Sequence, residues 1–287
     1  DDKMNTKPYI IALSTLAATS TAFAQDLKIQ NFLAQPEHFG VTSTLIEGDK
    51  EVLLVNAQFS KSEALRIAAD ILDSGKTLNT IFVSYGDPDF YFGLDVFKQY
   101  FPNVKIIATP ETVKHIQDTQ ALKVAYWGPK MGANAPSKII VPQAYTAKTL
   151  KLENENIEIK GKKELTYLWI PSAKAVVGGI PVSSGIHLWT ADTPTAKDRA
   201  EVVQALESIK ALNPQVVVPA HMKAGAAEGL DAVNFSIDYL KQYEKAVKLT
   251  KNSAELSQMM RKQYPALGES GSLDLGAKVV KGEMKWP

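Results

Sequence analysis

The order of predicted strands and helices constrains the fold of this chain more than any other feature. Residues 42–47 and 51–56 read as two strands around a Gly-Asp-Lys turn, which is a hairpin signal. Ser60, followed three residues later by a glutamate, has the spacing of a helix N-cap. Helix and strand patterns then alternate: a helix over 60–72, a strand over 80–84, a helix over about 91–100, a strand over 104–108 and a helix that begins at Pro110.

The second half of the chain is rich in short strand patterns before it returns to helices. The strand predictions cover residues 138–141, 149–152, 157–160, 165–170 and 174–177. A helix (196–212), a short apolar strand (215–219), a long helix (228–249) and a last helix (253–263) follow. Two strand-rich halves with helices on their outsides predict an α/β fold of two packed sheets covered by helices. No repeat or linker interrupts residues 25–287, so we expect a single domain.

The N-terminal residues read as processing signals rather than as part of the fold. Residues 1–3 precede a methionine and are typical of a tag remnant. Residues 4–24 combine a lysine, an apolar run (9–16) and a small-x-small motif, which predicts a signal peptide cleaved before Gln25. The alternative is a membrane anchor, but the apolar run is shorter than the ~20 residues that a span needs. We therefore expect a periplasmic or secreted protein with no stable membrane span after signal removal.

Charge and cysteine content exclude several classes of function. The chain has 32 Lys and Arg against 31 Asp and Glu, a formal charge of +1, so nothing indicates nucleic-acid binding. Cysteine is absent, which excludes disulfides, thiolate nucleophiles and zinc–sulfur sites. We expect a small-molecule ligand or substrate as the partner, and the oligomeric state stays open.

Three segments carry the candidate chemistry. Residues 83–94 read Val-Ser-Tyr-Gly-Asp-Pro-Asp-Phe-Tyr-Phe-Gly-Leu, residues 168–179 end in Gly-Gly, and residues 216–221 read Val-Val-Val-Pro-Ala-His. In order and spacing these segments resemble the metallo-β-lactamase superfamily, whose first motif is Thr-His-x-His-x-Asp-His-x-Gly-Gly. The resemblance covers most of the chain after residue 24. It implies a four-layer αββα sandwich with the site at the strand ends between the two sheets.

The resemblance also implies a two-zinc site for which this chain lacks most ligands. Only Asp89 and His221 match the family pattern, and no histidine stands shortly before Pro171. The other ligand positions hold different residues: Tyr85, Asp87, Phe90 and Gly179. The family's site draws on about five histidines, because imidazole suits zinc at neutral pH. The whole chain has four, so we expect no dinuclear zinc.

One divalent metal at most remains conceivable. Asp87, Asp89 and His221 would supply two carboxylates and one imidazole, a set that resembles iron or manganese sites more than structural zinc. The alternatives are structural. Asp and Pro form turns, Asp89 is a plausible helix cap, and His221 follows a strand that is predicted to be buried.

Aromatic and acid–base candidates surround this motif. Within residues 185–192, His187 and Asp192 are suited to acid–base chemistry and Trp189 to stacking on a ligand. The alternative is a loop packed by its own aromatics. The substrate-binding candidates in the first motif are Tyr85, Phe90 and Tyr91, for which ordinary core packing is the alternative.

Two functions follow as hypotheses. The first is a hydrolase of a small ester, lactone or similar substrate, with one metal or none, in which Asp89, His221 and His187 are the catalytic candidates. The second is a catalytically inactive periplasmic protein that binds a ligand or partner in the former active-site cleft. We do not expect β-lactamase activity, because the metal-bound hydroxide that attacks the amide needs the missing ligands.

Overall fold

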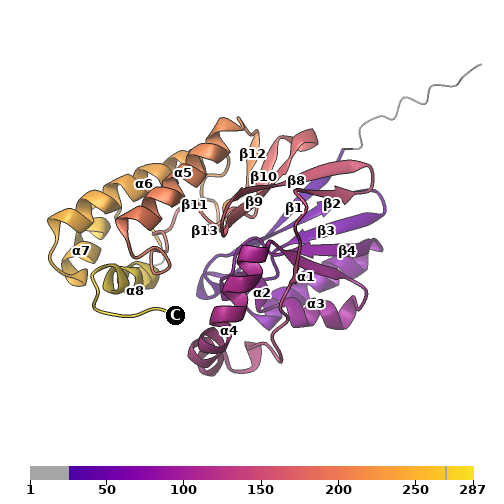
Figure 1. Cartoon of the computed structure of the whole chain (residues 1–287), viewed down its shortest axis with the longest axis horizontal. Coiled ribbons are helices and arrows are strands. Elements are labelled where there is room, and N and C mark those ends of the chain that lie inside the picture. Colours follow the sequence, from indigo (N-terminus) through magenta and orange to yellow (C-terminus); the bar gives the residue numbers. More distant parts are fainter. Residues whose placement is uncertain (1–25, 269) are drawn as a thin grey trace, which may run out of the picture.

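The structure is a computed structural model that describes residues 26–268 and 270–287. The predicted tag remnant, signal peptide and cleavage site fall within residues 1–25 and lie outside the described residues. The described chain forms two main β-sheets that pack face to face, with helices on the outside of each (Figure 1).

The larger sheet has six strands in the order β1-β2-β3-β4-β5-β6. β1, β2 and β3 are antiparallel, whereas β3 to β6 run parallel to one another. The predicted hairpin is confirmed as β2 and β3, in which Leu45 stands opposite Leu54. The strands are β1 (Lys28–Leu33), β2 (Thr42–Glu47), β3 (Glu51–Val55), β4 (Thr77–Phe82), β5 (Lys105–Ala108) and β6 (Gln143–Ala144).

The second sheet has five strands in the order β12-β10-β9-β8-β7. Its strands are antiparallel except for β12, which runs parallel to β10. A separate parallel pair, β11 with β13, lies at the end of this sheet. The strands are β7 (Thr149–Leu152), β8 (Glu155–Lys162), β9 (Leu165–Ile170), β10 (Ala175–Val177), β11 (Ser183–Ser184), β12 (Val216–Val217) and β13 (His221–Met222).

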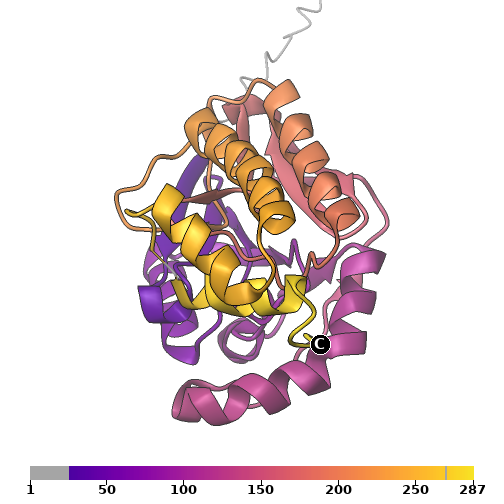
Figure 2. The same ribbon diagram turned by 90° about the vertical axis from the view of Figure 1, so that its left-hand side faces the viewer.

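The helices cover the outer faces of the two sheets. α1 to α4 lie on the larger sheet, and α5 and α6 pack side by side over the second sheet, followed by α7 and α8 (Figures 1 and 2). The helices are α1 (Lys61–Ser74), α2 (Pro88–Tyr91), α3 (Leu94–Tyr100), α4 (Pro110–Met131), α5 (Ala196–Ala211), α6 (Leu230–Leu249), α7 (Ser253–Gln263) and α8 (Ser270–Val280). The predicted N-cap of α1 is confirmed, because the Ser60 hydroxyl accepts a hydrogen bond from the Glu63 amide at 3.2 Å.

Strand periodicity shows why there are four layers. On β3, Leu53 and Val55 point toward the second sheet, whereas Leu54 points toward the helices. On β9, Leu168 belongs to the core between the sheets, and Tyr167 packs against the helices on the other side. Each sheet is therefore covered on both faces, which is the predicted αββα arrangement.

Three predictions about elements are wrong. Residues 138–141 form no strand, because Ile139, Ile140 and Val141 pack against the core of the larger sheet's helices instead of pairing. The helix predicted over about 91–100 is two helices, α2 and α3. The helix over 253–263 is not the last one, because α8 follows it. β1 was not predicted, since this edge strand is half exposed and lacks a clear apolar alternation.

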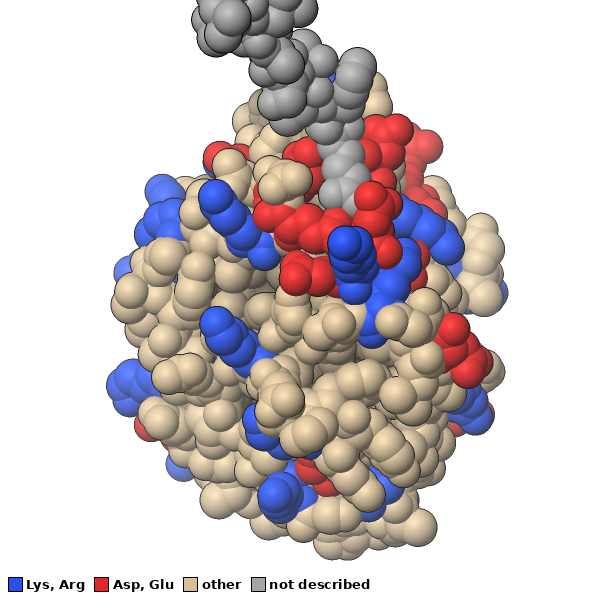
Figure 3. Space-filling model, turned by 90° about the vertical axis from the view of Figure 1, so that its right-hand side faces the viewer, with Lys and Arg blue, Asp and Glu red and all other residues tan. Residues whose placement is uncertain are grey.

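Neither the helices nor the charged surface indicate an unusual environment. Within the described residues, no helix combines the length and the apolar character needed to cross a membrane. Acidic side chains gather in the upper part of the face in Figure 3, with lysines among them, and the lower part is mostly uncharged. This mixture agrees with the balanced formal charge of +1.

Candidate functional site

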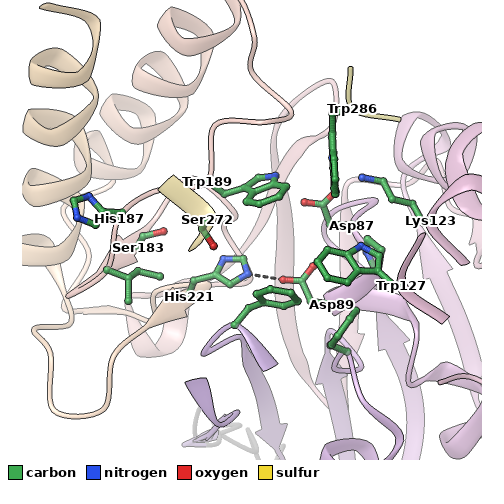
Figure 4. Close-up of a pocket in the computed structure, with 14 residues that line it drawn as sticks. Asp87, Asp89, Lys123, Trp127, Ser183, His187, Trp189, His221, Ser272 and Trp286 are labelled. Carbon is green, nitrogen blue, oxygen red and sulfur yellow. Dashed lines mark hydrogen bonds and ion pairs between the residues drawn. The ribbon is translucent and has the colours of Figure 1, made fainter. Parts of the chain in front are cut away.

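The carboxylate of Asp89 and the imidazole of His221 form a close pair at the strand ends. Asp89 lies in the first turn of α2, just after β4, and His221 begins β13. Because a carboxylate can only accept, Nε2 of His221 donates a hydrogen bond to Oδ2 of Asp89 at 2.5 Å (Figure 4). The two residues are 132 positions apart in the chain. The structure thus brings together the two residues that match the family pattern.

A second polar group beside this pair consists of Asp87, Asp192 and Lys123. Burial raises the pKa of Asp87 well above its ordinary value; the negative charge of Asp192 adds to this, and the Lys123 ammonium partly offsets it. Asp192 accepts a hydrogen bond from Nε1 of Trp189 at 2.5 Å and lies 3.9 Å from Nζ of Lys123. Oδ1 of Asp87 is buried and accepts no hydrogen bond from the described residues.

These polar groups line a hollow with aromatic walls (Figure 4). Its empty space amounts to about 570 Å³, within the roughly 300–1,000 Å³ of small-molecule sites. The aromatic side chains that line it are Phe39, Phe59, Trp127, Trp189 and Trp286. A second hollow, which includes Tyr85 and Leu165, adjoins it and shares Asp87, Ser183, Trp189 and His221 with it. We call the two adjoining hollows the cleft.

Three residues of the cleft were not predicted: Lys123, Trp127 and Trp286. Lys123 and Trp127 are one turn apart on α4, so both side chains lie on the same face of that helix. Their spacing is visible in the sequence, but the sequence does not show which helix face turns toward the site. Trp286 follows α8, a helix that the sequence patterns did not predict.

The predicted substrate-binding residues divide into two sets. Tyr85, Trp189 and Asp192 line the cleft, and burial raises the pKa of Tyr85 well above its usual value. Phe90 and Tyr91 are fully buried and line neither hollow. The Phe90 ring packs edge-on against His221, with centroids 5.6 Å apart. Core packing therefore describes these two side chains better than ligand contact.

His187 lies at the edge of the cleft but is largely enclosed by protein. Its side chain belongs to a residue that is 2% exposed, and Nδ1 is 2.8 Å from the Tyr239 hydroxyl. Burial lowers the pKa of His187 to about 4, so the ring is neutral at neutral pH. Its predicted role in acid–base chemistry stays a prediction.

Comparisons with known proteins identify the fold. No family model matches the sequence, and no curated protein matches it. A β-lactamase domain protein from Burkholderia ambifaria superposes with a TM-score of 0.62 and 14% identity, over 88% of this chain and 84% of that one. TMB-1 superposes with a TM-score of 0.50 and 14% identity, over 77% of this chain and 98% of that one.

This chain has the metallo-β-lactamase fold. The identification rests on the superposed structures together with the two-sheet topology. In this fold Asp89 and His221 occupy the positions that the resemblance assigns to metal ligands. Within the described residues, no group of three or more His, Asp or Glu side chains is arranged to hold a metal ion.

Proposed function

We propose that the cleft binds a small organic molecule and that it does so without a resident divalent metal. The observation that carries the proposal is the lining, in which several aromatic rings surround a few polar groups. This composition is typical of small-molecule sites, where apolar walls supply affinity and polar groups orient the ligand. TMB-1, which shares the fold, is described as binding substrate and inhibitor.

The contacts around Asp89 and His221 argue against a metal. The atoms that would face an ion, Nε2 of His221 and Oδ2 of Asp89, hydrogen-bond to each other. The Lys123 ammonium lies close enough to Asp87 to stabilise its carboxylate, and a divalent ion placed beside Asp87 would be repelled by the same charge. The buried Phe90 ring takes one ligand position. This donor set does not fit a divalent metal centre.

The metal part of the proposal is tested on the chain from residue 25 onward, purified without chelator. We expect well below one zinc, manganese or iron ion per chain, and the same thermal stability with and without these ions. The matched variant is His221→Ala. Stoichiometric metal in the unmodified protein that is lost in this variant would show that the contacts above have been misjudged.

The ligand part of the proposal is tested with a library of small aromatic acids, amines, esters and lactones, screened by thermal shift in the presence of chelator. We expect at least one compound to stabilise the protein, and Trp127→Ala to abolish the shift. Trp169→Ala is the matched control, because Trp169 lies on β9 and packs against the helices of the second sheet. A library without any hit, or equal losses in both variants, would contradict ligand binding in the cleft.

A second candidate function is metal-free hydrolysis, which the Asp89–His221 pair favours. With Nε2 donating to Asp89, Nδ1 of His221 is the ring atom that can accept a proton, and it makes no hydrogen bond to the described residues. It would take a proton from water as the water oxygen attacks an ester or lactone carbonyl, and return that proton to the leaving alkoxide. Asp89 would stabilise the imidazolium that forms.

Hydrolysis is tested with ester, lactone, thioester, phosphodiester and β-lactam substrates, each with chelator. Turnover that survives chelator and is lost in both Asp89→Asn and His221→Ala would support this candidate. Turnover of a β-lactam on the order of 10 per second or more, an ordinary enzyme rate, would contradict the absence of a metal site.

We propose in addition that the protein is exported to the periplasm or beyond. The support is the signal-peptide pattern of residues 4–24. Mass spectrometry of the protein from its native cell envelope should find Gln25, free or cyclised, as the first residue. A retained Met4 would contradict this and would favour the anchor.

A further inference from the structure

We infer that the slot in the cleft filled by the Trp286 indole is the subsite for a planar aromatic ring, and that such a ligand displaces the segment 284–287. The inference rests on the proposed ligand-binding function of the cleft. Its ligand class is a bicyclic aromatic ring that carries hydrogen-bonding atoms on its edge.

The surroundings of Trp286 are those of a ring-binding slot. Its ring centroid lies 5.3 Å from that of Trp189, 5.1 Å from Tyr126 and 6.3 Å from Trp127, each in an edge-on arrangement. Nζ of Lys123 stands 4.4 Å from the ring centroid, a cation–π contact. Three aromatic rings and a cation from three separate parts of the chain therefore surround one indole (Figure 4).

The indole fits the shape of this slot better than its polarity. Nε1 of Trp286 is buried and has no hydrogen-bond partner within the described residues. Oδ1 of Asp87, which lines the same hollow, also lacks one. A buried polar atom without a partner is unfavourable. A ligand ring whose edge atoms pair with the Asp87 carboxyl would thus be bound more favourably than the indole.

The segment that carries Trp286 is anchored only up to Glu283. Nζ of Lys281 donates to the carbonyl of Val247 at 2.7 Å, and the Glu283 carboxylate accepts from the amide of Ser253 at 2.8 Å. Beyond Glu283, no hydrogen bond joins residues 284–287 to the described chain. These residues form no helix or strand. The indole can leave the slot by rotation after Glu283 without breaking any backbone hydrogen bond.

Displacement predicts a measurable competition. A ligand that must displace an attached side chain binds more weakly by the factor with which that side chain occupies the slot. Benzimidazole is a suitable probe, because it has the size of indole and carries both a donor and an acceptor on one edge. We expect Trp286→Ala to bind benzimidazole at least about 10-fold more tightly than the unmodified protein does.

Two variants make this result specific to the slot. Trp169→Ala removes an indole elsewhere and should bind benzimidazole as the unmodified protein does. Lys123→Met in the Trp286→Ala background should weaken binding several-fold, because it removes the cation from the ring face. Affinities are measured by titration calorimetry.

A second readout uses the unmodified protein and does not depend on any variant folding. With ¹⁵N-labelled tryptophan, the chain's four tryptophans give four indole N–H signals, and the one missing in Trp286→Ala belongs to Trp286. Saturating benzimidazole should move this signal to the position of a solvent-exposed indole.

The possible results separate the inference from the proposed function. Equal affinity in the unmodified protein and Trp286→Ala, with an unchanged Trp286 signal, would overturn the displacement while ligand binding elsewhere in the cleft still stands. If neither protein binds benzimidazole or indole, the aromatic subsite is wrong, and the library screen alone then decides whether the cleft binds another class of ligand.

Discussion

Acid should destabilise this protein through His187, and the structure gives the size of the effect. The residue is 2% exposed and its ring contacts the hydroxyl of Tyr239 on α6. Burial lowers its pKa to about 4, the positive charge of Arg261 on α7 adds to this, and Asp274 on α8 opposes it. In the unfolded chain the same imidazole titrates near its model value of 6.5.

The sign and magnitude follow from proton binding. Since the folded state takes up the proton less readily, the contribution of neutral His187 to stability is complete above about pH 6.5 and is lost as the pH falls toward 4. With pKa values of 6.5 and about 4, the loss between about pH 7.5 and pH 5 amounts to about 2 kcal/mol. That is a large share of the ~5–15 kcal/mol that stabilises a typical domain.

Urea unfolding at both pH values measures the effect. His187→Gln is the control, because glutamine can still hydrogen-bond to Tyr239 but does not titrate. The free energy of unfolding should fall by about 2 kcal/mol more in the unmodified protein than in this variant. Equal losses in the two proteins, or an imidazole NMR titration of His187 near pH 6.5 in the folded state, would refute the reasoning.

Two further predictions concern packing. Gly93→Ala should cost at least about 2 kcal/mol, because its new Cβ would lie 2.0 Å from the carbonyl oxygen of Ala57; Gly271→Ala, which meets no atom within 4 Å, should cost nothing measurable in the same urea titration. Arg199→Ala should cost about 3 kcal/mol, because the buried guanidinium binds Glu244 at 2.7 Å and two loop carbonyls. Lys163→Ala, which removes an exposed ion pair, should change the melting temperature little, and comparable losses in both would contradict the assigned role of burial.

Much of the fold could be predicted because its elements are encoded locally. The hairpin of β2 and β3 follows from two apolar runs around a polar turn, and α1 follows from its N-cap and amphipathic period. The strands over 149–152 and 165–170 and the helix over 253–263 have the predicted bounds. Short or half-exposed elements such as β1 and β6 were missed, since their pairing depends on neighbours that a local pattern does not contain.

The site divides in the same way. The sequence alone determined the chemistry available at the strand ends, including the match of Asp89 and His221 to a known pattern and the shortage of histidines. It also placed Tyr85, Trp189 and Asp192 among the candidates, and these residues line the cleft.

Only the tertiary structure decided how these groups are used. It hydrogen-bonds Asp89 to His221, buries Phe90 in the core, and assembles the aromatic walls from segments as distant as α4 and Trp286. Residue types and local periods describe what a side chain can do, whereas its partners depend on which helix faces and strand ends meet when the two sheets pack. Those contacts join residues more than 100 positions apart, as Asp89 and His221 do across 132, and no local pattern contains them.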